Sequence, residues 1–92
     1  MKEGRLIKVA NIETTMPPGE VEAYIRGQPG CDKLEVHWPQ FLSLSDEANP
    51  GLCFVEVPTL GWVAYALDTL GALPIGKDGD LTTATPMNMQ KN

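Results

Sequence analysis

The sequence has few of the side chains that carry nucleophilic and metal chemistry: one histidine, His37, and two cysteines, Cys31 and Cys53, among 92 residues. None of the three falls into Cys-x-x-Cys or His-x-x-x-His spacing, so the pattern gives a zinc site no support. Six residues of mostly extended chain place Cys31 and His37 up to about 20 Å apart, which argues against a catalytic dyad. We therefore expect no catalytic residue, no metal and no cofactor, with His37 on the polar surface that it shares with Glu35.

Two cysteines are also too few for the disulfide scaffold of a small secreted domain, which usually holds four to eight. Cys53 lies in an apolar run and is expected to be buried, whereas Cys31 follows a Pro-Gly turn and could lie at the surface. A bridge between them is the less favoured alternative. Met1 is followed by the charged stretch Lys-Glu-Gly-Arg instead of an apolar signal core. We therefore expect the protein in a reducing cytoplasm.

Positive charge is scarce. Only seven residues are Lys or Arg against twelve Asp and Glu, which gives a net charge of −5. The basic residues are scattered, and no cluster of them could follow a nucleic-acid strand, so we expect no direct nucleic-acid binding. An acidic surface suits a protein partner with a basic surface, although solubility alone would also explain most of these charges.

Phosphate-binding and calcium-binding loops are missing as well. Gly27, Gly30 and Gly51 stand near prolines and serve turns, outside any Gly-x-Gly-x-x-Gly pattern. The Asp78-Gly79-Asp80 stretch lacks the further ligands of a twelve-residue calcium loop and predicts an ordinary turn.

One apolar run is long enough to be weighed against a membrane span. Between Val57 and Gly76 the only charged residue is Asp68. An aspartate near the centre of a bilayer would cost about 2.5–3.5 kcal/mol, and Pro58 and Pro74 bracket the run. The run therefore predicts an unusually apolar helix that does not enter a membrane.

Nine glycines and eight prolines divide the chain into short elements. Alternation of apolar and polar residues predicts strands, and recurrence at i, i+3 and i+4 predicts helices. The predicted strands are 5–12, 33–38, 52–57 and 81–85, and the predicted helices run from Pro17 to about residue 26 and over 60–73. A continuation of the second strand towards Leu44 would form a hairpin with the third.

This order of elements favours an α+β domain over residues 1–86, followed by a tail over 87–92. Helices separated from paired strands favour a small antiparallel sheet of three or four strands with two helices on one face. The ferredoxin-like βαββαβ arrangement is the first candidate, and a three-stranded sheet is the alternative if the last strand does not form.

The predicted second helix is the most informative segment. Its expected inner stripe is Leu60, Val63, Ala64, Leu67 and Leu70, and its only charged residue is Asp68. That leaves an apolar side elsewhere on the helix, composed of Trp62, Tyr65, Ala66 and Thr69. Tryptophan and tyrosine are enriched in binding hot spots, so these residues predict a docking face. Equally, the rings could cover a sheet edge or the tail, since an apolar helix must be buried against something. Trp38 and Tyr24 are expected in the core.

Two functions fit these features. The first is a small acidic, non-enzymatic module that inhibits or regulates a larger protein complex. Small phage-encoded inhibitors of bacterial defence, such as anti-CRISPR proteins, have this general build, although no motif places the chain in such a family. Its acids would then meet a basic, nucleic-acid-binding groove on the partner. The acids expected there are Glu20, Glu22, Asp46 and Glu47.

The second function is an oligomeric small-molecule sensor or a small cofactor-free enzyme with a ligand site between subunits. A homodimer built through Trp62 and Tyr65 would supply that interface. A coupling subunit of a multicomponent enzyme is a special case of the first hypothesis. The sequence leaves this choice open.

Overall fold

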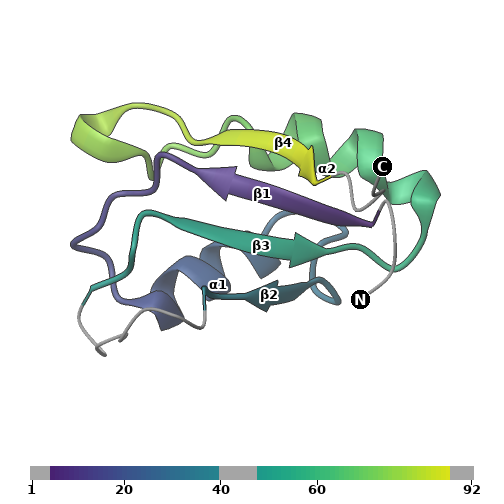
Figure 1. Ribbon diagram of the computed structural model, residues 1–92, viewed down its shortest axis with the longest axis horizontal. Helices are drawn as coiled ribbons and strands as arrows, with labels where there is room; N and C mark the ends of the chain where they lie inside the picture. The colour runs from purple at the N-terminus through teal and green to yellow at the C-terminus, as the bar shows by residue number, and fades with distance from the viewer. Residues whose placement is uncertain (1–4, 40–47, 88–92) are drawn as a thin grey trace, which may run out of the picture.

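The protein is an α+β domain with a four-stranded antiparallel sheet and two α-helices, as expected (Figure 1). The computed structural model describes residues 5–39 and 48–87. The strands, α-helices and short 3₁₀ turns follow in the order β1 (Leu6–Ala10), α1 (Pro18–Arg26), β2 (Glu35–His37), β3 (Leu52–Glu56), η1 (Leu60–Trp62), α2 (Val63–Leu70), η2 (Lys77–Gly79) and β4 (Thr83–Met87).

The strands lie in the order β2-β3-β1-β4, and every neighbouring pair is antiparallel. The chain passes from β1 through α1 to β2 and leaves room for β3 between the two strands. It then passes from β3 through α2 to β4, and β1 lies between these two strands in the sheet. β1 and β3 are therefore the central strands, and β2 and β4 form the edges.

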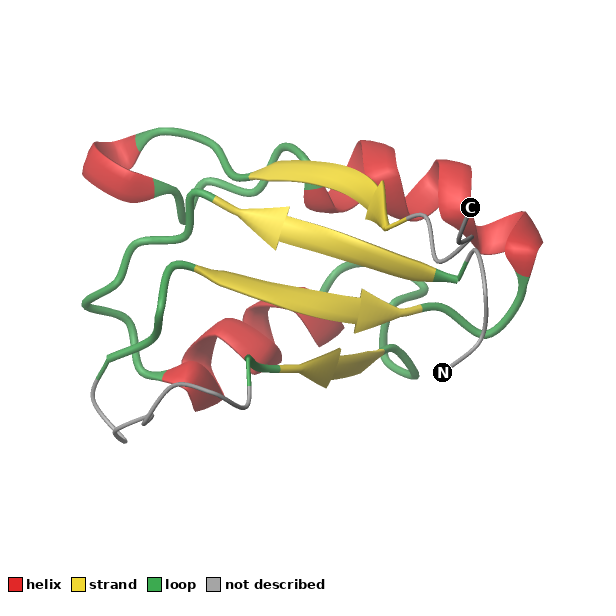
Figure 2. Cartoon of the chain, in the orientation of Figure 1, coloured by secondary structure: helices red, strands yellow, loops and turns green. Residues whose placement is uncertain are grey.

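Both helices lie on one face of this sheet, which we call the covered face (Figures 1 and 2). Alternation along β1 sends Ile7 and Val9 to that face, where both side chains are fully buried. The register pairs Ile7 with Val55 and Val9 with Cys53, so the two central strands contribute a continuous apolar surface. The core residues that this face shares with the helices include Val21, Ile25, Ala66 and Leu70. Lys8, Phe54 and Thr85 project from the opposite side, the open face.

Helix α1 begins one residue after the predicted start. Pro17 has an extended backbone and Pro18 is the first helical residue, where its missing N–H is no loss. Val21 and Ile25 are one turn apart and both are fully buried. Tyr24, which was expected in the core, is instead 36% exposed, because it lies outside the stripe that these two residues define.

The second helix differs from the prediction in extent and in phase. A 3₁₀ turn occupies residues 60–62, and the α-helix ends at Leu70 instead of continuing to Leu73. A 3₁₀ turn has 3.0 residues per turn and an α-helix has 3.6, so the apolar stripe does not run straight through both. Val63, Leu67 and Leu70 of the predicted inner stripe do contact the core, whereas Leu60 and Ala64 are exposed and Ala66 is buried with the stripe instead.

The other boundaries lie within a few residues of the predicted ones. β2 is shorter than the 33–38 stretch, although Leu34, Val36 and Trp38 do contact the core as the alternation indicates. β4 begins at Thr83 and includes Met87, the first residue assigned to the tail. The expected hairpin through Leu44 lies outside the described residues. Within 5–39 and 48–87, no helix combines the length and apolarity that a membrane crossing requires.

Candidate functional site

A shallow groove forms where the start of α2 meets the turn that follows α1. It has a volume of about 460 Å³, and its lining residues come from two parts of the chain that are about 30 positions apart. The lining consists of Pro29, Gly30, Gly61, Trp62 and Tyr65. We refer to it as the aromatic groove.

Two contacts fix the walls of the aromatic groove. The rings of Trp62 and Tyr65 lie edge to face, with centroids 5.6 Å apart and planes at 78°. The Tyr65 hydroxyl donates a hydrogen bond to the carbonyl oxygen of Pro29 and so ties α2 to the turn. Gly30 has a φ of +78°, and a Cβ at that position would lie 3.2 Å from Trp62 Cη2. Glycine is therefore suited to this position both by its backbone conformation and by the close approach of the indole.

The structure divides the four residues of the predicted docking face. Tyr65 is 41% exposed. Trp62 is partly buried and packs against the core, so its ring both supports the fold and lines the groove. Thr69 is half-buried. The assignment of Ala66 is corrected, because its side chain is fully buried in the core and cannot contact a partner.

The predicted acidic residues are also divided. Glu20 is exposed in the first turn of α1. Glu22 has partners inside the protein: its carboxylate accepts a 2.7 Å hydrogen bond from Trp38 Nε1 and forms an ion pair with Arg26 at 3.3 Å. It is therefore engaged in holding α1 against Trp38. Asp46 and Glu47 lie outside the described residues.

Both cysteines are free and fully buried. This agrees with the expectation for Cys53 and corrects the suggested surface position of Cys31. Burial raises the pKa of the Cys53 thiol to about 12, with a smaller contribution from the charge of Glu22. Burial likewise raises the pKa of Cys31, with the neighbouring Asp32 adding to the shift. Neither thiol is activated as a nucleophile, because nucleophilic cysteines need a lowered pKa.

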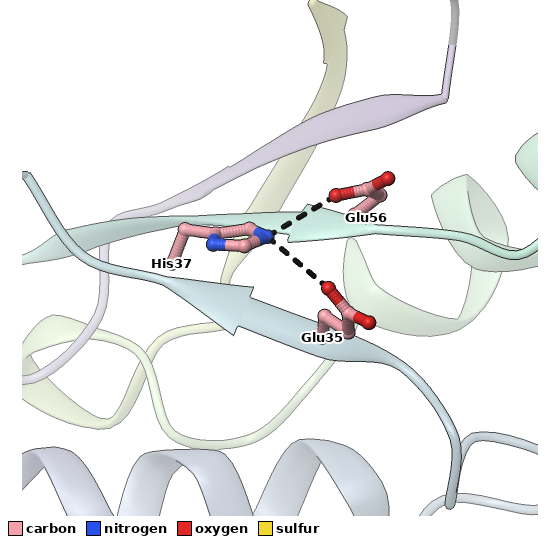
Figure 3. A group of neighbouring side chains, drawn as sticks. All are labelled: Glu35, His37 and Glu56. Atoms are coloured by element: carbon pink, nitrogen blue, oxygen red, sulfur yellow. Dashed lines mark hydrogen bonds and ion pairs between the residues drawn. The ribbon is translucent and has the colours of Figure 1, made fainter. Parts of the chain in front are cut away.

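A second cluster lies on the open face and combines one imidazole with two carboxylates (Figure 3). Glu35 and His37 share a face of β2, as the alternation predicts. Glu56 of β3 stands directly opposite Glu35 in the strand register. His37 Nε2 lies 3.3 Å from Glu56 Oε1 and 3.8 Å from Glu35 Oε1. We refer to these three residues as the sheet-face cluster.

The sequence prediction missed the sheet-face cluster because Glu56 is 21 positions from Glu35 along the chain. The available signal was a polar residue within the otherwise apolar strand 52–57. Only strand pairing shows that this residue faces the Glu-x-His alternation of β2.

Comparison with protein-family models gives no match for this chain. Comparison with curated proteins gives no match either.

Proposed function

We propose that the protein is a non-enzymatic binding module that uses the aromatic groove to dock on a larger protein and regulate it. The observation that carries the proposal is the groove itself: two aromatic rings whose planes meet at 78°, one of them 41% exposed and hydrogen-bonded to the backbone of the turn. Aromatic anchors in partly enclosed pockets are the usual centres of protein interfaces.

The net charge of the chain favours a basic partner. None of the five residues that line the groove is charged. Of the exposed charged residues that lie within three positions of a lining residue in the chain, Asp32 and Asp68 are acidic and Lys33 is basic. The whole chain carries a net charge of −5. The occupant that fits is a protein segment that inserts an apolar side chain and presents Lys or Arg beside it.

The proposal extends to the class of fold and to location. The two crossovers, β1-α1-β2 and β3-α2-β4, each enclose a strand of the other, which supports a ferredoxin-like arrangement of split β-α-β units. Two free, buried thiols suit a reducing cytoplasm. Inhibition of a nucleic-acid-binding complex, as in phage-encoded inhibitors, is the form of regulation that an acidic module of this size favours.

The test measures binding to a defined array of short peptides in which one apolar residue is flanked by Lys and Arg, with the same array flanked by Glu as reference. We expect the protein to prefer the basic set, and Tyr65→Ala to lose at least about tenfold in affinity, as a hot-spot residue does. Leu81→Ala is the matched control, because Leu81 is an exposed apolar residue outside the groove. Equal binding to both sets, or equal losses in the two variants, would contradict the proposal.

Self-association is the competing use of the same surface. Light scattering after size exclusion distinguishes it: we expect a monomer whose mass is unchanged by Tyr65→Ala. A dimer that this substitution dissociates would instead assign the groove to an interface between two copies, as the oligomeric sensor hypothesis requires.

A further inference from the structure

The sheet-face cluster is independent of the aromatic groove and is not used in the proposed function. Its three side chains come from two paired strands and converge from neighbouring positions on the open face, as Figure 3 shows. We propose that Glu35, His37 and Glu56 form a binding site for a divalent first-row transition-metal cation of the Zn²⁺ class.

The distances suit a small tetrahedral ion. Zn–N and Zn–O bonds of about 2.0–2.2 Å place neighbouring ligand atoms about 3.3–3.6 Å apart. His37 Nε2 and Glu56 Oε1 are already 3.3 Å apart. The distance from His37 Nε2 to Glu35 Oε1 is 3.8 Å, and all three ligand atoms lie within 4.8 Å of one another. The Glu35 side chain is 71% exposed, so it is free to change its rotamer and move closer to the other two ligands.

The charges around the cluster leave a place for a cation. The register sets the carboxylates of Glu35 and Glu56 directly across from each other, and like charges in that position repel. Arg5 pairs with Glu56 Oε2 at 3.6 Å, which leaves Oε1 as the oxygen that faces His37. In the described part of the chain, Glu35 forms no ion pair with a lysine or an arginine. Arg5 compensates part of the charge of Glu56, whereas a cation between the carboxylates would also compensate that of Glu35.

Arg5 also orients the site. Besides its ion pair with Glu56, its guanidinium donates a hydrogen bond to the carbonyl oxygen of Pro58 just beyond β3. Glu56 is thus held by a side chain that is itself anchored to the backbone. Outer contacts of this kind fix the direction of a ligating carboxylate.

The ligand set selects the class of ion. An imidazole nitrogen suits Zn²⁺ and its first-row neighbours, whereas Mg²⁺ and Ca²⁺ prefer oxygen ligands throughout. Three protein ligands also leave one tetrahedral position for water or for an atom of another molecule. We therefore expect Zn²⁺ to bind and Mg²⁺ to compete poorly.

The single histidine makes the test direct. The protein is labelled with ¹⁵N-histidine and titrated with Zn²⁺ alone, while calorimetry on unlabelled protein gives the dissociation constant. We expect one equivalent of Zn²⁺ to bind and to shift the Nε2 resonance of His37. Zinc that binds without moving that resonance, or a resonance that Mg²⁺ moves at the same concentration, would overturn the proposal.

Three variants localise the binding. We expect each of the variants Glu56→Gln, Glu35→Gln and His37→Gln to weaken Zn²⁺ binding by at least about tenfold. Loss of an outer contact already lowers metal affinity by about tenfold or more, and loss of a direct ligand should lower it at least as much. Glu35→Gln is the safeguard if the other two disturb folding, because Glu35 is the most exposed of the three.

Two control variants lie elsewhere. Glu20→Gln removes one negative charge, as Glu35→Gln does, but at an exposed position of α1. Tyr65→Ala alters the aromatic groove. Glu20→Gln should leave the zinc affinity within about twofold, since surface charges at a distance are screened. Tyr65→Ala should do the same, because Tyr65 is not one of the three ligating residues. A loss in Glu20→Gln equal to that in Glu35→Gln would show only general attraction to negative charge and would reject the site.

Discussion

The two faces of the sheet carry different kinds of side chain. On the covered face, Ile7, Val9 and Val55 are fully buried against the helices. On the open face, the same strands carry Lys8 and Glu56, and the sheet-face cluster lies at one edge. Adjacent residues of one strand therefore serve different ends. Ile7, Val9 and Val55 hold the fold together, whereas Glu35 and His37 on the open face are accessible for binding.

We expect the largest difference in the free energy of unfolding between substitutions of two adjacent residues of β1, Ile7 and Lys8. Ile7→Ala leaves a cavity in the core and should lower the free energy of unfolding by about 2–5 kcal/mol. Lys8→Ala changes the open face and should alter it by less than about 0.5 kcal/mol. Urea titration followed by circular dichroism measures both. Similar losses in the two variants would mean that the open face is covered in solution.

Two threonines allow the same comparison of a buried and an exposed side chain, this time for hydrogen bonds. Thr82 lies just before β4, and Thr85 lies within it. The buried hydroxyl of Thr82 donates to the Leu70 carbonyl at 2.6 Å and accepts from the Leu73 N–H at 3.1 Å. Thr82→Val keeps the shape but leaves these groups unpaired, at a cost of about 1–3 kcal/mol. Thr85→Val, on the open face, should stay within about 0.5 kcal/mol. Thermal unfolding of the two variants tests this, and equal melting temperatures would contradict it.

The buried thiols add a pH dependence that comes from the covered face. In the unfolded chain the Cys53 thiol ionises near the ordinary cysteine pKa of 9.0, whereas burial raises its pKa in the folded protein to about 12. Between pH 9 and about pH 12 the thiol is ionised in the unfolded state but protonated in the folded state. Rising pH therefore stabilises the unfolded state relative to the folded state. We expect the free energy of unfolding to be unaffected by this thiol below about pH 9 and to fall above it by up to about 1.4 kcal/mol per pH unit.

Cys53→Ala is the comparison for that measurement, with urea titrations at about pH 8 and about pH 10, on either side of the ordinary thiol pKa. The variant removes the Cys53 contribution, so its stability should fall less over this interval than that of the original chain. Parallel losses in the two proteins would show that the thiol does not account for the alkaline instability.

We expect the smallest change in the free energy of unfolding from a substitution on the open face when no metal is bound. Glu35→Gln removes a charge that lies opposite Glu56, and its side chain is 71% exposed. We expect the free energy of unfolding to change by less than about 0.5 kcal/mol in the presence of a chelator, since exposed charge pairs contribute little. A loss of several kcal/mol would place Glu35 among the residues that hold the fold together, which its exposure argues against.

Much of the local structure followed from residue patterns. Alternation placed Leu34 and Val36 towards the core and Glu35 and His37 away from it, because successive side chains of a strand point to opposite faces. The Pro17-Pro18 pair marked the start of α1. The exposure of Leu60 did not follow, because a pattern read as one continuous helix does not show the 3₁₀ turn that precedes α2.

The sequence by itself determined the types of the elements, the two faces of β2 and the α+β class, since these depend on neighbours within a few positions. Only the tertiary structure decided that Glu56 stands opposite Glu35 and that Tyr65 bonds to Pro29. Both contacts join residues more than 20 positions apart. Periodicity determines to which face of an element a side chain points. Strand order and register determine which distant residue it contacts, and these depend on the packing of the whole core.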